Sequence, residues 1–274
     1  MRIIVLAANK YSDRALATVV ALCQSGHAPA ACLCVSTANF FNLARKAAQY
    51  GAGNFLKYAA RRVGLLGSSK LAGVSARGLA QGLRDSRLGD DVVVLSNVDE
   101  ACRHYKIELR YANDVNGERS LSWLRRLAPD LIVYTGGGIL RRPLIDIPTL
   151  GVINAHSGLL PEYRGMNVTE WALLNRDEIG ITVHFIDTGI DTGRILFTRR
   201  MQVTPEDVSI NALRARVGCA TVDALVEAVG MLERGAVAPI NQVPGDSKQY
   251  FVMHEKLLEV AERKLLAAKS SADV

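Results

Sequence analysis

The chain has 274 residues, of which 49% are hydrophobic and 22% charged, and its formal net charge is +6. This composition is typical of a globular protein and excludes a largely disordered chain. The longest apolar runs, such as LIVY at 131–134, are too short to cross a bilayer. The first residues do not resemble a cleavable signal, so we expect a cytoplasmic protein. The excess of positive charge favours anionic partners such as nucleotides or phosphates.

Two classes of cofactor are excluded by what the sequence lacks. Its five cysteines are odd in number and scattered, which predicts no disulfide framework, and no Cys/His spacing is typical of a zinc site. We therefore expect no metal. The turn at residues 8–13, after the first predicted strand, contains no glycine. The G-x-G-x-x-G motif of dinucleotide-binding proteins is thus absent, and we expect neither NAD nor FAD.

The N-terminal residues predict a βαβ unit. Residues 2–8 (RIIVLAA) are typical of a buried parallel strand, and residues 13–25 have the apolar spacing of a helix. Gly26 is a natural end for that helix, and residues 30–35 predict a second strand. This order predicts a parallel sheet with right-handed crossovers.

Residues 38–90 differ from their surroundings and predict a basic helical insertion. They contain nine Lys or Arg residues and two acidic residues, with glycines between weakly helical runs. The favoured interpretation is a solvated helical insertion that covers one sheet edge. A basic lid over an anionic substrate and a segment that binds a membrane surface or a partner are the alternatives.

Strand and helix patterns alternate again after the insertion. Apolar or alternating runs predict strands at residues 91–95, 106–111, 130–134, 152–155, 182–186 and 195–199. Helical spacing predicts helices at residues 118–128 and 166–175. The fold class is therefore α/β, with a Rossmann-like, mostly parallel sheet flanked by helices.

The C-terminal part predicts helices only. A long helical pattern covers residues 206–234, and Pro205 suits its first turn. A final helix follows at about 250–267. We therefore divide the chain into a main domain at 1–205, which includes the insertion, and a small, mainly helical region at 206–274.

The candidate catalytic residues lie in residues 151–195. Asn154 and His156 stand at the end of a predicted strand, where ligands bind in open parallel sheets, and Asp191 stands in a later glycine-bounded loop. An amide can hold an oxyanion, an imidazole can move a proton, and a carboxylate can set the charge of the imidazole. Together they suit acyl transfer to an amine. Taken singly, such a histidine is more often structural, and such an aspartate is more often a turn residue.

Further polar residues near these positions are candidates for binding an anionic substrate. The loop at 157–165 contains glycines and a proline and can offer backbone amides and a guanidinium. The candidates for substrate binding are Lys10, in the turn after the first predicted strand, and Ser157, Tyr163, Arg164 and Gly165 in or beside this loop.

The combined pattern resembles the formyltransferase family that uses 10-formyltetrahydrofolate. The family has Asn-x-His, Leu-Leu-Pro-x-Tyr-Arg-Gly, Gly-x-Thr-x-His and Asp-x-Gly in this order. The chain has NAH at 154–156, LLPEYRG at 159–165, GITVH at 180–184 and DTG at 191–193. The preceding segment DLIVYTGGGIL at 130–140 is also similar to the family. The strong resemblance covers residues 129–200, and it implies that 1–205 is a formyltransferase catalytic domain.

The resemblance implies a role for each candidate. Asn154 would hydrogen-bond the formyl oxygen as it becomes an oxyanion, and His156 would stabilise that oxyanion or move the proton. Asp191 would orient the imidazole and raise its pKa. The folate ring would lie against the backbone of two loops, at Ile139, Leu140, Ile186, Asp187, Thr188 and Gly189. His184 also matches a family position, although its other interpretation is a histidine packed within a strand; Asp187 is equally a ligand contact or a turn former.

The resemblance leaves the acceptor amine open. A nucleotide-linked amino sugar is favoured, because the turn at residues 8–12 lacks a glycine-rich phosphate loop and residues after 205 show no RNA-binding pattern. The alternatives are glycinamide ribonucleotide, methionyl-tRNA, a lipid-linked sugar, and hydrolysis of 10-formyltetrahydrofolate. A non-catalytic folate-binding module is the alternative from a different class. We expect a small, phosphate-bearing amine as partner, rather than DNA or tRNA, and a homodimer.

Overall fold

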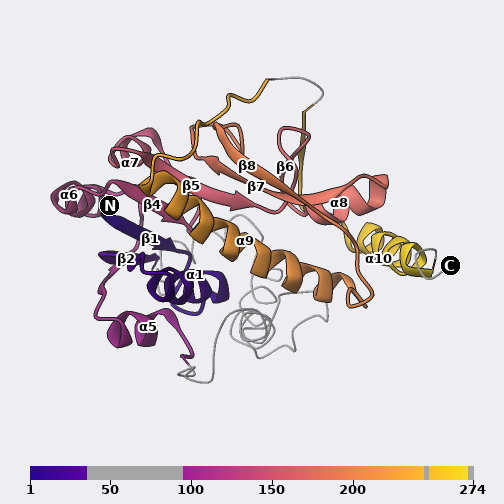
Figure 1. The fold of residues 1–274 in the computed structure, drawn as a ribbon, viewed down its shortest axis with the longest axis horizontal. Helices are drawn as coiled ribbons and strands as arrows, with labels where there is room; N and C mark the ends of the chain where they lie inside the picture. The colour runs from indigo at the N-terminus through magenta and orange to yellow at the C-terminus, as the bar shows by residue number, and fades with distance from the viewer. Residues whose placement is uncertain (36–94, 244–246, 271–274) are drawn as a thin grey trace, which may run out of the picture.

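The protein is built on one central sheet. The computed structural model describes residues 1–35, 95–243 and 247–270 of the chain. Its seven strands lie in the order β3-β2-β1-β4-β5-β7-β8 (Figure 1). The strands are β1 (Ile3–Ala7), β2 (Ala31–Val35), β3 (Glu108–Ala112), β4 (Leu131–Tyr134), β5 (Gly151–His156), β7 (Ile179–Phe185) and β8 (Ile195–Met201). The first five run parallel, and β7 and β8 are added antiparallel at one edge.

The sheet separates two hydrophobic clusters, because adjacent residues of a strand point to opposite faces. Val5, Val133 and Ile153 belong to the larger cluster. The helices of that cluster are α1 (Asp13–Gln24), α5 (Val98–His104), α8 (Val168–Asn175), α9 (Ile210–Glu233) and α10 (Glu255–Ser270). On the other face, Ile4 and Ile132 pack with α6 (Glu118–Leu127) and α7 (Arg142–Ile145).

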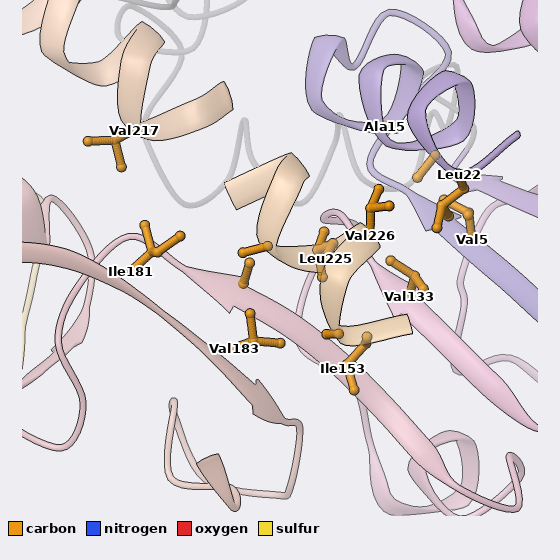
Figure 2. Packing of buried hydrophobic residues seen from close by; sticks show 14 of the residues in the cluster. Val5, Ala15, Leu22, Val133, Ile153, Ile181, Val183, Val217, Leu225 and Val226 are labelled. Carbon is orange, nitrogen blue, oxygen red and sulfur yellow. The ribbon is translucent and has the colours of Figure 1, made fainter. Parts of the chain in front are cut away.

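Helix α9 covers the middle of the sheet. It runs across the sheet beside α1 (Figure 1) and contacts β5 and β7. Figure 2 shows Leu225 and Val226 of α9 in the same cluster as Val133 of β4 and Ile153 of β5. Leu225 is fully buried. The C-terminal part therefore shares the main core, and the division of the chain at residue 205 stays a prediction.

A second, two-stranded sheet connects the C-terminal part to the loop after β5. Strands β6 (Tyr163–Gly165) and β9 (Lys248–Tyr250) pair in parallel. The indole of Trp171 on α8 donates a hydrogen bond to the carbonyl of Phe251, 3.0 Å away. The chain after β9 thus lies against the helix that follows β6.

The structure confirms the predicted α/β class and mostly parallel sheet, and it corrects some boundaries. Helix α9 begins at Ile210 and not at 206, because the Ser209 hydroxyl caps it by accepting from the Ala212 amide at 3.1 Å. The Asp207 carboxylate accepts from the Thr204 amide at 2.8 Å, so residues 204–207 form a turn. Helix α10 begins at Glu255, because residues 248–250 form β9 instead.

Other predictions concern segments that the structure does not describe or does not contain as predicted. The basic insertion at 38–90 lies outside the described residues, as does most of the strand predicted at 91–95, and Leu95 is not in a strand. Helices α5 and α7 and the strands β6 and β9 were not predicted, since elements of three to seven residues show little periodicity. The homodimer stays a prediction. Within the described ranges, no helix is long and apolar enough to cross a membrane.

We expect Leu225→Ala to lower the free energy of unfolding by about 2–5 kcal/mol, because it opens a cavity between α9 and the sheet. Unfolding in urea, followed by circular dichroism, measures the change. Leu257→Ala on α10 is the matched control, since Leu257 is 37% exposed, and it should change stability far less. Equal losses in both variants would show that α9 is not part of the main core.

Candidate active site

The candidate site begins as a polar face on two neighbouring strands. Ile153 and Ala155 of β5 point into the larger hydrophobic cluster, so Asn154 and His156 point to the opposite face. Strand β7 alternates in the same way and pairs with β5 so that Asn154 lies opposite His184 and His156 lies opposite Thr182. All four polar side chains are buried. The register alone therefore assembles an amide, two imidazoles and a hydroxyl.

Asp191 reaches this face from the loop between β7 and β8. Its Oδ2 atom lies 3.5 Å from Nδ1 of His156, and its Oδ1 atom lies 3.6 Å from Nε2 of His184. The backbone amide of Gly165 donates to Oδ2 at 2.9 Å. The Gln242 side chain donates to the Asp191 carbonyl at 3.0 Å and to the Gly193 carbonyl at 2.6 Å. One carboxylate thus faces both histidines and is fixed by backbone and side-chain contacts.

The contacts of His156 decide which of its two ring nitrogens carries the proton and which has a lone pair. Nε2 lies 2.7 Å from the carbonyl of Tyr163, and a carbonyl can only accept, so Nε2 carries the proton and donates. In the neutral ring, Nδ1 then presents its lone pair toward Asp191. Burial lowers the pKa of His156 below its ordinary value, although Asp191 opposes this shift. His156 is therefore a neutral base at pH 7, beside a carboxylate that stabilises the proton it takes up.

His184 carries its proton on the other ring nitrogen, Nδ1. Its Nδ1 donates to the carbonyl of Phe185 at 2.8 Å, so Nε2 is the acceptor and lies 3.4 Å from Nδ2 of Asn154. Burial lowers the pKa of His184 to about 4, so the ring is neutral at physiological pH. It accepts one N–H of the Asn154 amide and leaves the other N–H for a ligand.

The predicted catalytic residues come together, and the predicted donor-binding residues lie on two loops. Ile139 is 72% exposed and its carbonyl accepts from the Asn116 side chain at 3.0 Å, whereas Leu140 is buried. Thr188 and Gly189 are exposed, and Ile186 is half-buried. The Asp187 carboxylate accepts from the Gly189 amide at 3.0 Å, so this aspartate forms a turn. Donor binding by these residues stays a prediction.

The predicted substrate-binding residues are placed differently from one another. The Tyr163 ring stacks on Tyr250 with centroids 5.0 Å apart, so its side chain packs in the structure while its carbonyl holds His156. Arg164 is half-buried, and its Nε atom is buried with no hydrogen-bond partner in the part of the chain that is described. The Lys10 ammonium lies 4.7 Å from the Tyr11 ring centroid.

The remaining two candidates contribute backbone groups. The Ser157 carbonyl accepts from the Thr169 hydroxyl at 2.8 Å. Gly165 has a φ of +101°, and a Cβ atom there would lie 2.1 Å from the Tyr250 carbonyl oxygen. Only glycine fits where β6 meets β9, and this glycine also donates to Asp191.

Two residues of the site were missed by the sequence analysis. Arg14 on α1 donates to the Ala155 carbonyl at 2.6 Å and to Oδ1 of Asn154 at 3.3 Å, and Gln242 holds the Asp191 loop. Neither residue stands in a motif, and each contacts a segment far away in the sequence. The described ranges contain no group of three or more His, Cys, Asp or Glu side chains that could hold a metal ion.

Comparison with known proteins relates the chain to one family. The family model described as "Formyl transferase" matches residues 72–229. A methionyl-tRNA formyltransferase of Koribacter versatilis (strain Ellin345) is 39% identical over 129 residues, which are 46% of this chain and 41% of the relative. The chain therefore matches about two fifths of the length of that relative.

Solved structures agree with the fold. The phosphoribosylglycinamide formyltransferase of Anaplasma phagocytophilum has a TM-score of 0.56 at 17% identity, covering 93% of this chain and 99% of that one. WlaRD, a sugar 3N-formyl transferase whose structure was determined with dTDP and 5-N-formyl-THF, has a TM-score of 0.52 at 12% identity, covering 92% of this chain and 70% of that one. At these identities the likeness establishes the fold alone.

We expect His184 to make the protein less stable as the pH falls from about 6.5 to about 4. The unfolded state binds a proton on this histidine near its ordinary pKa of 6.5, while the folded state binds it only near 4. Unfolding is thereby favoured in acid, by about 3 kcal/mol at pH 4 relative to pH 7. Urea unfolding of the wild type and of His184→Gln between pH 4 and pH 7 measures the free energy of unfolding of each protein.

The variant should lose this part of the pH dependence, whereas His104→Gln, at an exposed histidine, should keep it. If the free energy of unfolding depended on pH equally in the wild type and in His184→Gln, the assignment of a neutral, buried His184 would be contradicted.

Proposed function

Because the chain belongs to the formyl transferase family, we propose that it transfers a formyl group from 10-formyltetrahydrofolate to a primary amine at Asn154, His156 and Asp191. One observation carries this assignment of residues: Nδ1 of His156 faces the Asp191 carboxylate at 3.5 Å, on the same sheet face as the Asn154 amide. A base, its counter-charge and an oxyanion donor are the three groups that formyl transfer requires.

The proposed reaction uses each group at one atom. The acceptor amine attacks the formyl carbon, and the carbonyl oxygen becomes an oxyanion that accepts a hydrogen bond from Nδ2 of Asn154. Nδ1 of His156 takes the proton of the amine, and the Asp191 carboxylate stabilises the imidazolium. The bond from the formyl carbon to the folate nitrogen then breaks, and the imidazolium proton goes to that nitrogen. The products are the formamide and tetrahydrofolate, and His156 is neutral again.

The donor is proposed to lie between the loop after β4 and the loop after β7. Ile139 and residues 187–189 are exposed, so these two loops can offer hydrogen-bonding groups to a flat ring. The loop after β4 is held by Asn116, whose side chain donates to the Ile139 carbonyl and accepts from the Arg141 amide at 2.8 Å. A fixed loop of this kind costs little ordering entropy when it binds a ligand.

For the acceptor we propose a nucleotide-linked amino sugar. The net charge of +6 favours an anionic substrate. Arg164 supports the same choice, because its Nε atom is buried without a hydrogen-bond partner among the described residues and stands next to Gly165, which binds Asp191. A guanidinium in that position suits a diphosphate. Methionyl-tRNA is the second candidate, favoured by sequence relatives such as the Koribacter versatilis protein, a methionyl-tRNA formyltransferase.

Mass spectrometry of reaction products separates these acceptors. The protein is incubated with 10-formyltetrahydrofolate and, in parallel, nucleotide-linked amino sugars, glycinamide ribonucleotide and methionyl-tRNA. A formyl group gained by a sugar supports the proposal, and one gained by methionyl-tRNA supports the second candidate. Formate released without any formylated acceptor indicates hydrolysis of the donor. Donor binding with neither product indicates a non-catalytic folate-binding module.

We expect Asn154→Ala to lower kcat on the best acceptor by about a hundredfold or more, because it removes the donor to the oxyanion. Steady-state kinetics measure the loss, and KM for the donor should change little. Asn113→Ala, at an exposed asparagine outside the site, is the control and should match the wild type. Full activity of Asn154→Ala would remove this residue from the proposed reaction.

A further inference from the structure

Arg14 is a half-buried cation at the edge of the site. It stands in the first turn of α1, and its Nη2 atom donates to the Ala155 carbonyl at 2.6 Å and to Oδ1 of Asn154 at 3.3 Å. Its Nε atom is buried and has no hydrogen-bond partner in the described part of the chain. Burial lowers the pKa of Arg14 to about 10, so it remains charged at neutral pH. Both groups to which it donates are neutral, although taking even part of a cation out of water is costly.

These contacts fix the orientation of the Asn154 amide. The guanidinium can only donate, so it must face the amide oxygen, while Nε2 of His184 faces the amide nitrogen at 3.4 Å. If the amide rotated by half a turn, its NH₂ group would face a guanidinium and its oxygen would face a lone pair. Arg14 and His184 thus hold Asn154 in the one orientation that leaves an N–H for an oxyanion.

We propose that Arg14 is a positioning residue for formyl transfer, which orients and polarises the Asn154 amide from behind. The proposal rests on the formyl-transfer function above. A cation on the amide oxygen draws electron density from the nitrogen and strengthens its remaining N–H as a donor. This interaction gains most when negative charge develops on the formyl oxygen, so it acts on kcat rather than on the binding of either substrate.

The same charge acts on His156. The groups that face this imidazole are Asp191 from the loop after β7, the Tyr163 carbonyl from β6, His184 from β7 and Arg14 from α1. Burial lowers the pKa of His156 and Arg14 lowers it further, while Asp191 and the carbonyl raise it. Removing the cation should therefore raise the pKa of His156.

The test compares Arg14→Met, Arg14→Lys and the control Arg126→Met, at an exposed arginine on α6. We expect Arg14→Met to lower kcat by about tenfold to a hundredfold and to leave both KM values within about twofold, as expected for an interaction made in the transition state. Arg14→Lys keeps the charge and should recover part of kcat. Unchanged kcat, or a rise in KM alone, would overturn the proposal.

The pKa of His156, measured by NMR titration with His156→Gln for assignment, gives a second readout that needs no turnover. It should rise in Arg14→Met, stay close to wild type in Arg14→Lys, and not move in Arg126→Met. If Arg14→Met does not fold, Arg14→Lys decides. A purely structural role predicts that its kcat falls only in proportion to its folded fraction, whereas the proposed role predicts a larger fall in kcat.

Failure of the function and failure of the inference give different results. A wild type that formylates no acceptor overturns both. A wild type that is active, with Asn154→Ala impaired and Arg14→Met unimpaired, overturns the role of Arg14 alone.

Discussion

The site depends on the register between β5 and β7. This antiparallel pair places Asn154 opposite His184 and His156 opposite Thr182, while Ile153 and Val183 remain in the larger core cluster. Because side chains alternate along a strand, a slip of one residue would bury the polar groups in that cluster and expose the apolar ones. The apolar residues under α9 therefore fix the geometry of the polar face. Packing on one face of the sheet thus fixes the positions of the polar side chains on the other face.

Three distant segments then complete the polar face. Gly165 of β6 binds the Asp191 carboxylate, and β9 leaves no room for a side chain at that glycine. Gln242 binds the carbonyls of Asp191 and Gly193 from a segment near the C-terminus. Arg14 approaches from the N-terminal helix. Asn154, His156 and Asp191 are each held by a partner on another segment. Such networks specify a single arrangement because a partly satisfied one is costly.

Local signals in the sequence were enough for part of this site. Asn154 and His156 stand at the end of a predicted strand and Asp191 stands in a glycine-bounded loop. The resemblance of these motifs to the formyltransferase family predicted that the three residues meet. Arg14 could not, because it is 140 residues from Asn154 and one residue on an amphipathic helix has no distinguishing period. The start of α9 was predicted wrongly because Pro205 suits a helix start, while the Ser209 cap and the turn at Asp207 decide it. Strands β6 and β9 exist only through their pairing with each other.

The two histidines share one carboxylate, and their hydrogen bonds decide which takes the proton. Protonation of His184 at Nε2 would set its new N–H against the Asn154 amide and remove the acceptor that orients this amide. Nδ1 of His156 faces only Asp191 among the contacts that the structure describes, so a proton there gains an ion pair and breaks no hydrogen bond. Burial also lowers the pKa of His184 to about 4. In the proposed reaction, His184 thus stays neutral and supports the oxyanion donor, and His156 is the base.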